Sequence, residues 1–266
     1  MVRFLEYMIQ NISVELLRAV TGDGYPIIST RNEISTVPDL LQGRHEEFVL
    51  SPRIDTEMVA EACRAGCIPM AHKIGDFEFL MIKLHHFRSV LQFPDLHTPR
   101  KTRSRSRGLR IAVDRDFSRC LGAVRDHYPP SMRWLTPRLC TVLDELHGQP
   151  RSGVSTHSIE VYDGAGLVAG EIGYRIGAVY TSMSGFYLRS GSGTVQLVSL
   201  ARILESSGFL FWDLGIDVAY KRTIGAKLFP RAQFLALYYR GTALSAGFPP
   251  GDLSCEELIR GSEVNR

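Results

Sequence analysis

The sequence predicts a mixed α/β fold, of the α+β kind, with a regular second half and a less regular first half. Apolar residues make up 44% and charged residues 22% of the 266 residues, which is typical of globular proteins and excludes disordered and fibrous chains. Short apolar runs that suit strands alternate with longer runs whose apolar residues recur at helical spacing. These two observations together indicate helices packed on a sheet.

In the first half, helices are predicted where apolar residues recur at helical spacing between capping and breaking residues. Asp55 is placed to cap the second of these helices, and Gly66 and Pro69 end it. Pro137 occupies a first-turn position of the fourth. The predicted helices are 1–20, 56–65, 117–124 and 136–147, and the predicted strands are 77–84 and 109–113.

The second half is more regular, and its strands are joined by tight turns. The predicted strands are 158–162, 166–172, 178–182, 209–212 and 234–239, and the predicted helices are 195–206 and 219–225. This order is that of an acyltransferase-like α/β sandwich. A loop at 148–156 predicts the boundary, so we expect an N-terminal domain (1–148), a C-terminal domain (149–240) and a polar tail (241–266).

The charge is nearly balanced, at +3, but one stretch is strongly basic. It predicts contact with a nucleic-acid backbone, although a solvated loop has the same composition. The residues are Arg100, Lys101, Arg103, Arg105, Arg107 and Arg110. The five cysteines are an odd number, and only Cys63 and Cys67 lie close together, so we expect reduced thiols and no metal site.

The N-terminal segment carries Glu6 and Glu15, whereas a secretory signal would be free of acids. No apolar run approaches the length of a membrane span. We therefore expect a cytoplasmic protein that does not enter a membrane.

Several short motifs occur in the same order as in one known family. His157-Ser158-Ile159-Glu160-Val161 resembles HSIEVW, and Leu167 to Gly173 resembles LVGG-x-x-G. The remaining matches are Ser184 and Phe186 with GESMFS, Phe211-Trp212-Asp213 with LIDCQ, Ile224 to Arg231 with SLGA-x-x-IPR, Asp114 to Phe117 with DRDF, Trp134-Leu135-Thr136 with TWIT, Leu146-His147 with LH, and Arg64 to Pro69 with R-x-G-I-F-P-W. Over residues 50–240 the chain thus resembles leucyl/phenylalanyl-tRNA–protein transferases.

The resemblance implies an aminoacyltransferase that moves an amino acid from a charged tRNA to the N-terminal α-amine of a protein, which creates a degradation signal. It implies a C-terminal acetyltransferase-like (GNAT-type) domain and a smaller mixed N-terminal domain. The implied partners are aminoacyl-tRNA and an acceptor protein or peptide with a free N-terminus. It implies no metal and no cofactor besides the charged tRNA, and we expect a monomer.

The resemblance also assigns candidate site residues. Asp213 would be catalytic, holding the attacking amine or the terminal ribose at a strand end. Trp134 would stack on the terminal adenine, with Ser184 and Phe186 beside the 3′ end of the tRNA. The walls of the aminoacyl pocket would be Glu171, Tyr180, Leu197 and Leu200.

The sequence departs from the family's motifs at positions that bear on the chemistry. Gly215 replaces a Gln, and Met183 replaces the Glu of GESMFS. Glu171 stands where the family has an apolar Met, and a buried carboxylate there is costly unless a cation pairs with it. A pocket with such a wall suits an arginine side chain in place of Leu or Phe. Alternatively, Glu171 faces solvent on the other side of its strand.

Two other functions stay open at the level of sequence. The segment 188–194, LRSGSGT, is close to the pyrophosphate-binding turn of acyl-CoA N-acyltransferases, but Leu188 stands where Arg or Gln is needed. Loss of the Gln and Glu side chains is also compatible with a non-catalytic relative that binds tRNA or a degradation signal.

Overall fold

The structure is a computed structural model that describes residues 13–22 and 24–261. Residues 13–21 are helical, and the rest of the helix predicted over 1–20 lies outside the described residues. Contacts divide the chain into two compact units, and neither is continuous in sequence. Unit 1 comprises residues 1–86 and 130–154, and unit 2 comprises residues 87–129 and 155–266.

The described part of unit 1 contains a three-stranded antiparallel sheet in the order β1-β3-β2. Its helix α3 begins after Asp55, whose side chain accepts a hydrogen bond from the Met58 backbone N–H at 2.9 Å, as predicted. The elements are η1 (Arg31–Thr36), α2 (Val37–Leu40), β1 (Phe48–Ser51), α3 (Thr56–Arg64), β2 (Ile68–Ile74), β3 (Phe77–Lys83), η3 (Pro130–Met132) and α6 (Pro137–Gly148).

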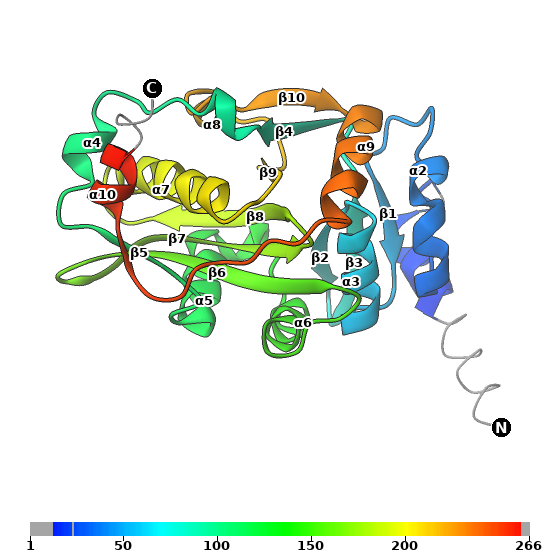
Figure 1. Ribbon diagram of the computed structural model, residues 1–266. Helices are drawn as coiled ribbons and strands as arrows, with labels where there is room; N and C mark the ends of the chain where they lie inside the picture. The colour runs from blue at the N-terminus through cyan, green and yellow to red at the C-terminus, as the bar shows by residue number, and fades with distance from the viewer. Residues whose placement is uncertain (1–12, 23, 262–266) are drawn as a thin grey trace. The chain divides into compact units, whose positions relative to one another are not determined.

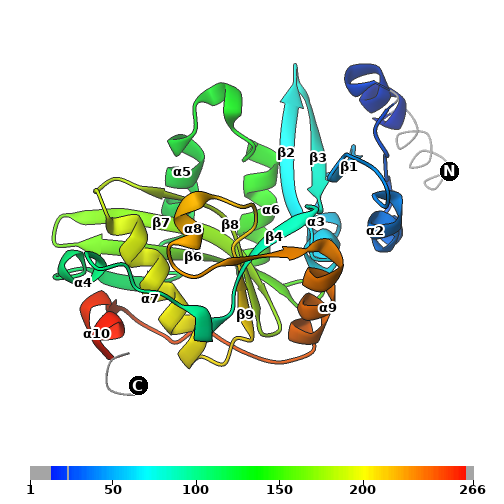
Figure 2. The same cartoon turned by 90° about the horizontal axis from the view of Figure 1, so that it is seen from above.

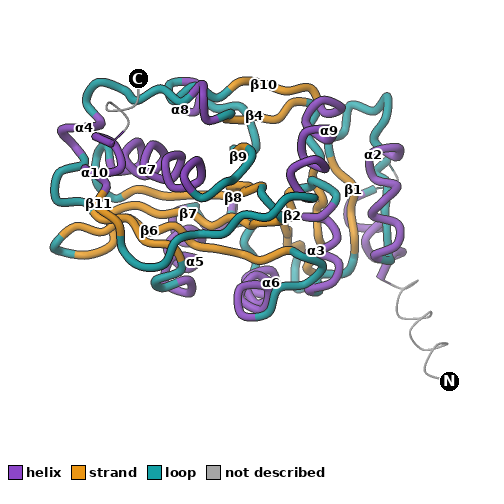
Figure 3. The backbone as a smooth tube through the Cα atoms, in the orientation of Figure 1, coloured by secondary structure: helices purple, strands orange, loops and turns teal. Residues whose placement is uncertain are grey.

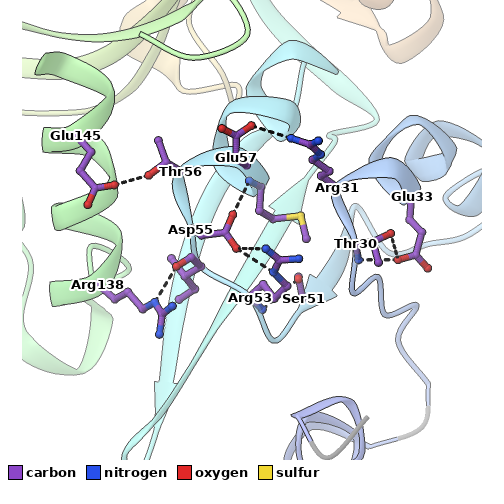
Figure 4. A network of polar contacts seen from close by, with 12 residues as sticks. Thr30, Arg31, Glu33, Ser51, Arg53, Asp55, Thr56, Glu57, Arg138 and Glu145 are labelled. Carbon is purple, nitrogen blue, oxygen red and sulfur yellow. Dashed lines mark hydrogen bonds and ion pairs between the residues drawn. The ribbon is translucent and has the colours of Figure 1, made fainter. Parts of the chain in front are cut away.

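Polar contacts tie the helix starts of unit 1 to their neighbours (Figure 4). The Thr30 backbone N–H and hydroxyl both donate to Glu33 Oε2, at 2.7 and 2.8 Å, which caps η1. Arg138 Nε of α6 donates to the Ile54 carbonyl at 2.7 Å, and Thr56 donates to Glu145. These contacts join the segment 130–154 to the α3 region, which explains why unit 1 takes residues from both sides of 87–129.

The described part of unit 2 is built on an eight-stranded sheet in the order β10-β4-β9-β8-β7-β6-β5-β11. Its strands are β4 (Phe87–Leu91), β5 (Arg110–Val113), β6 (Val154–Asp163), β7 (Gly166–Ile176), β8 (Val179–Tyr187), β9 (Phe211–Asp213), β10 (Lys227–Pro230) and β11 (Leu253–Ser254). Neighbouring strands of known register are antiparallel, apart from β8 and β9, which run parallel. A long connection through helix α7 (Ser192–Ser206) separates these two strands, as parallel pairing requires.

Helices cover both faces of this sheet (Figures 1 and 2). Helix α7 lies on one face and α5 (Phe117–His127) on the other, and both pack against β7. This explains why nearly every residue of β7 is buried, instead of buried residues alternating with exposed ones. The remaining elements of unit 2 are η2 (Phe93–Asp95), α4 (Thr102–Arg105), α8 (Ala219–Arg222), α9 (Arg231–Thr242) and α10 (Cys255–Arg260).

The mixed α/β class is confirmed, but two local predictions are wrong. Residues 234–239 form part of helix α9, not a strand (Figure 3). Phe234, Tyr238 and Gly241 are its buried residues, which is helical spacing, and a short apolar run cannot distinguish helix from strand. The segment 241–266 is not a polar tail throughout, because β11 pairs with β5, and Cys255 and Ile259 of α10 join the core.

The units also differ from the predicted domains. The predicted boundary at 148–149 lies close to the third crossing between the units, after residue 154. Residues 87–129 belong to unit 2, because β4 and β5 pair with strands of its sheet. A single boundary predicted from sequence composition cannot assign residues 87–129 to unit 2, because the strands with which they pair lie far away in the chain.

Candidate functional site

A cavity of about 600 Å³ opens in unit 2 at the point where the sheet splits. Strands β8 and β9 pair only as far as Thr181 and Asp213. Beyond these residues β8 continues along β7, while the chain after β9 turns away toward α8. The cavity is lined by residues of β8 from Ser182 onward, by the start of α7 and by residues 214–221. Parallel strands that diverge in this way leave space for a ligand at their carboxyl ends.

Glu171 lies in the wall of the cavity with 4% of its surface exposed, not on a solvent-facing side of β7. Its Oε1 accepts a hydrogen bond from Ser182 Oγ at 2.6 Å, and its Oε2 accepts one from Gln196 Nε2 at 2.8 Å. Ser182 Oγ in turn accepts from Trp212 Nε1 at 2.9 Å. Neutral donors from β8 and α7 therefore fix the carboxylate in one orientation, and Trp212 of β9 orients the Ser182 donor.

Burial raises the pKa of Glu171 to about 7. The hydroxyls of Ser182 and Tyr180, the charge of Lys221 and the amide of Gln196 oppose this rise. Of the described residues, none forms an ion pair with Glu171 within 4 Å. A carboxylate with such a pKa changes its charge near neutral pH. The cavity can thus present either a neutral acid or an anion to a ligand.

The predicted pocket residues divide into two groups. Glu171, Ser184, Phe186 and Leu197 line the cavity. The Ser184 and Tyr128 hydroxyls are hydrogen-bonded at 2.9 Å, which connects β8 to the chain after α5. Within the described part of the chain, Tyr180 and Leu200 are fully buried and do not contribute to the lining.

Asp213 is fully buried at the end of β9 and does not line the cavity among the described residues. Both its carboxylate oxygens accept from Arg88 Nε of β4, at 3.0 and 3.2 Å. Thr181 Oγ1 donates to Oδ2 at 3.0 Å, and the Gly215 backbone N–H donates to Oδ1 at 2.9 Å. Asp213 therefore fixes the turn that follows β9, at the edge of the cavity.

Trp134 belongs to unit 1, where 7% of its surface is exposed. Its backbone carbonyl accepts from the Ala71 N–H of β2 at 3.1 Å. Stacking of this indole on a base stays a prediction, and it requires access to a side chain that is largely buried.

The six basic residues from Arg100 to Arg110 are all exposed, on and around α4. Arg105 also lines the cavity, where its side chain lies against Gly191 at the start of α7. A Cβ at position 191 would lie 2.5 Å from Arg105 Cδ. Through Arg105 the basic segment thus reaches the cavity.

We expect that replacing Arg103, Arg105 and Arg107 by Ala weakens tRNA binding. Loss of three cations should reduce the slope of log K against log salt by about 2 to 3. Titration of tRNA at several salt concentrations measures this slope, with Arg31→Ala as the control, because Arg31 is an exposed arginine of unit 1 outside the basic segment. An unchanged affinity and an unchanged slope would place the tRNA on another surface.

Several residues that line the cavity could not be predicted from the sequence. Lys221, Gln196, Tyr128 and Ser182 were not predicted, because a lysine in a polar helical stretch or a glutamine in an amphipathic helix usually faces solvent. Within the described residues, no cluster of three or more His, Cys, Asp or Glu side chains is arranged to hold a metal ion. The described helices are all too short or too polar to cross a membrane.

Comparisons with known proteins identify the family. The sequence model of the leucyl/phenylalanyl-tRNA protein transferase family matches residues 90–239, more than half of the chain. The leucyl/phenylalanyl-tRNA–protein transferase of Jannaschia sp. is 27% identical over 199 residues, covering 74% of this chain and 90% of its own length. That of Rubrobacter xylanophilus is 28% identical over 204 residues, covering 74% and 99%.

A solved structure of FemX shares 10% identity at a TM-score of 0.40, covering 76% of this chain and 77% of its own. The chain therefore belongs to the leucyl/phenylalanyl-tRNA protein transferase family, on the strength of the sequence comparisons. It is an aminoacyltransferase of the type that uses charged tRNA.

Proposed function

We propose that the chain transfers an amino acid with a cationic side chain, arginine, from charged tRNA to the N-terminal α-amine of a protein or peptide. The added residue acts as a degradation signal, and the charged tRNA is the donor with no further cofactor. The observation that carries this proposal is the buried Glu171 carboxylate in the wall of the cavity, inside the segment that matches the family.

The cavity residues take their roles from their positions. The aminoacyl ester lies between Ser184 and Phe186 of β8, and the amino-acid side chain extends toward Glu171 and Leu197. Arg105 and the rest of the basic segment bind the tRNA backbone at the mouth. Asp213 acts as a positioning residue, because its oxygens are occupied by Arg88, Thr181 and Gly215.

The polar floor of the cavity argues against leucine and phenylalanine. Glu171, Ser182 and Gln196 would lose contact with water beneath an apolar side chain and gain no new hydrogen bond. Glu171 keeps its hydrogen bonds from Ser182 and Gln196, but its charge would be cut off from water with no cation beside it. This costs more than the roughly 1–3 kcal/mol of a neutral group left unpaired. A guanidinium ion instead donates to the free lone pairs of the carboxylate and neutralises it, while its methylene groups pack on Leu197.

The change that tests this specificity is Glu171→Met, which gives the cavity an apolar wall. We expect kcat/KM with Arg-tRNA to fall by about 10²-fold, the loss of a charge-assisted interaction, while use of Leu- or Phe-tRNA rises. Single-turnover transfer to a peptide, with each charged tRNA in turn, measures both effects. Glu205→Met, an exposed acid at the far end of α7, is the matched control.

Because Glu171 has a pKa of about 7, the preference for Arg over Leu in this transfer assay should depend on pH. Its carboxylate is anionic above about pH 7, so preference for Arg over Leu should rise between pH 6 and 8. Protonation of the acceptor amine slows Arg transfer and Leu transfer equally. The ratio of the two transfer rates is therefore independent of that protonation. Glu171→Gln should make this ratio independent of pH. Efficient transfer of Leu or Phe by the unmodified chain, without transfer of Arg, contradicts the proposed specificity.

A further inference from the structure

Lys221 is a buried ammonium group in the cavity wall that the proposed specificity does not use. It comes from the short helix α8, and 7% of its surface is exposed. Its Nζ donates to the Leu214 carbonyl at 2.5 Å and to the Ile216 carbonyl at 2.9 Å. A lysine is rarely buried without a direct ion pair, because removing its charge from water is costly.

The turn that holds Lys221 is itself fixed from the other side. Gly215 lies between the two carbonyls, has φ of 75°, and donates its N–H to Asp213. The Leu214 N–H donates to the Ser89 carbonyl of β4 at 2.8 Å. Arg88, Asp213 and the turn thus place the ammonium group at one position on the wall, in advance of any ligand.

An ammonium group has three N–H bonds, and two of those of Lys221 go to the carbonyls. Nζ also lies 5.8 Å from the centre of the Tyr220 ring, and the described residues offer no hydrogen-bond acceptor to the third N–H. Four charged groups act on it: Asp213 of β9, Glu171 of β7, Asp217 after β9 and Arg88 of β4. Burial lowers the pKa of Lys221 below its usual 10.5, and the three carboxylates oppose this. The protonated group therefore has one donor to offer a ligand in the cavity.

We infer that Lys221 is a catalytic residue that donates a hydrogen bond to the ester carbonyl oxygen as negative charge develops on it during aminoacyl transfer. This role rests on the proposed function. The lone pair of the acceptor amine attacks the ester carbonyl carbon, and the C–N bond forms while the π electrons move to the oxygen. That oxyanion then collapses, the bond to the ribose oxygen breaks, and the ribose hydroxyl leaves with the proton that the amine loses.

The physical argument is preorganisation. A donor that is already fixed in a site with little water stabilises developing charge without the cost of reorienting solvent. Lys221 meets this condition because its carbonyl partners come from a turn anchored to β4 and β9. Both oxygens of Asp213 and both oxygens of Glu171 already accept hydrogen bonds, so neither side chain is placed to donate one to the ester oxygen.

The test compares Lys221→Met, which keeps the length but removes the charge, with Lys221→Arg, which keeps the charge and the donors. We expect kcat for Lys221→Met to fall by about 10²–10³-fold, with KM for the charged tRNA changed less than about threefold. Lys221→Arg should retain a substantial part of the rate. Lys227→Met is the matched control, because Lys227 is exposed and pairs only with Asp95 among the described residues.

A pH profile separates catalysis from a merely structural role. The rate of the unmodified chain should fall at high pH as Lys221 loses its proton, below pH 10.5. Lys221→Arg should not show this fall, because a guanidinium stays protonated. The assay uses single-turnover transfer from the charged tRNA that the unmodified chain uses best, corrected for ester hydrolysis.

The outcomes separate the two proposals. If the unmodified chain transfers from no charged tRNA, the proposed function fails, and this role fails with it. If the unmodified chain transfers and a folded Lys221→Met protein matches its rate, the proposed function stands and the role of Lys221 is overturned. If Lys221→Met does not fold, an identical high-pH fall in Lys221→Arg overturns the role instead.

Discussion

Replacing Arg88 by Met is expected to lower the free energy of unfolding by about 3–5 kcal/mol. Arg88 and Asp213 are 1% and 0% exposed, so the substitution leaves a carboxylate buried without its cation. The remaining donors to Asp213, Thr181 Oγ1 and the Gly215 N–H, are neutral and cannot balance the charge. Denaturant unfolding monitored by circular dichroism measures the loss.

The double variant Arg88→Met/Asp213→Asn provides the control. Asparagine keeps an acceptor for Thr181 and Gly215 but carries no charge, so the double variant should recover most of the lost stability. Arg202→Met, which breaks an ion pair with the exposed Glu205, should cost less than about 1 kcal/mol. A loss below about 1 kcal/mol for Arg88→Met would show that the buried pair does not stabilise unit 2.

Gly225→Ala is expected to be comparably destabilising, by about 3–5 kcal/mol. A Cβ at this position would lie 1.9 Å from the Asp95 carbonyl oxygen, and the backbone has φ of 100°. The Ile224 carbonyl also accepts from the His97 N–H at 2.9 Å, so the two segments cannot separate without losing that bond. Because Gly225 follows α8, the displacement would move Lys221 away from the turn at 214–216.

Gly208→Ala is a control that separates the effect of the positive φ from the effect of the steric clash with Asp95. Gly208 has φ of 81°, but nothing lies within 4 Å of its missing Cβ, so only backbone strain of about 1–2 kcal/mol remains. Thermal unfolding of both variants measures the difference. Equal losses for Gly208→Ala and Gly225→Ala would contradict the close approach of Gly225 to η2.

The helix caps and most of the second half could be predicted from the sequence, because local signals determine them. Asp55 caps the helix it precedes, as its position suggested, and Pro137 lies in the first turn of α6, as predicted. The strand β4 was missed, because its burial depends on β9 and β10, more than 100 residues away in the chain. Helix α9 was misread as a strand for the same reason, since only its packing shows which residues are buried.

The candidate site was predicted in part. Motif register placed Glu171, Ser184, Phe186 and Leu197 at the cavity that the structure contains. Lys221 gave no signal, because its burial arises from carbonyls of a turn whose shape depends on Asp213 and Arg88. Residue spacing along a chain predicts which residues share a face of a helix or strand. It does not predict that a nearby turn will surround Lys221 when the shape of that turn depends on Arg88, far away in the chain.

Transfer of amino acids from a mixed pool of charged tRNAs to a peptide with a free N-terminus tests the central claim most directly. The unmodified chain is incubated with the pool, and the peptide product is read by intact mass. The account predicts a product heavier by one arginine residue, formed only while the tRNA is charged and lost when the peptide N-terminus is blocked. A peptide that gains no amino acid, or gains only leucine or phenylalanine, would contradict it.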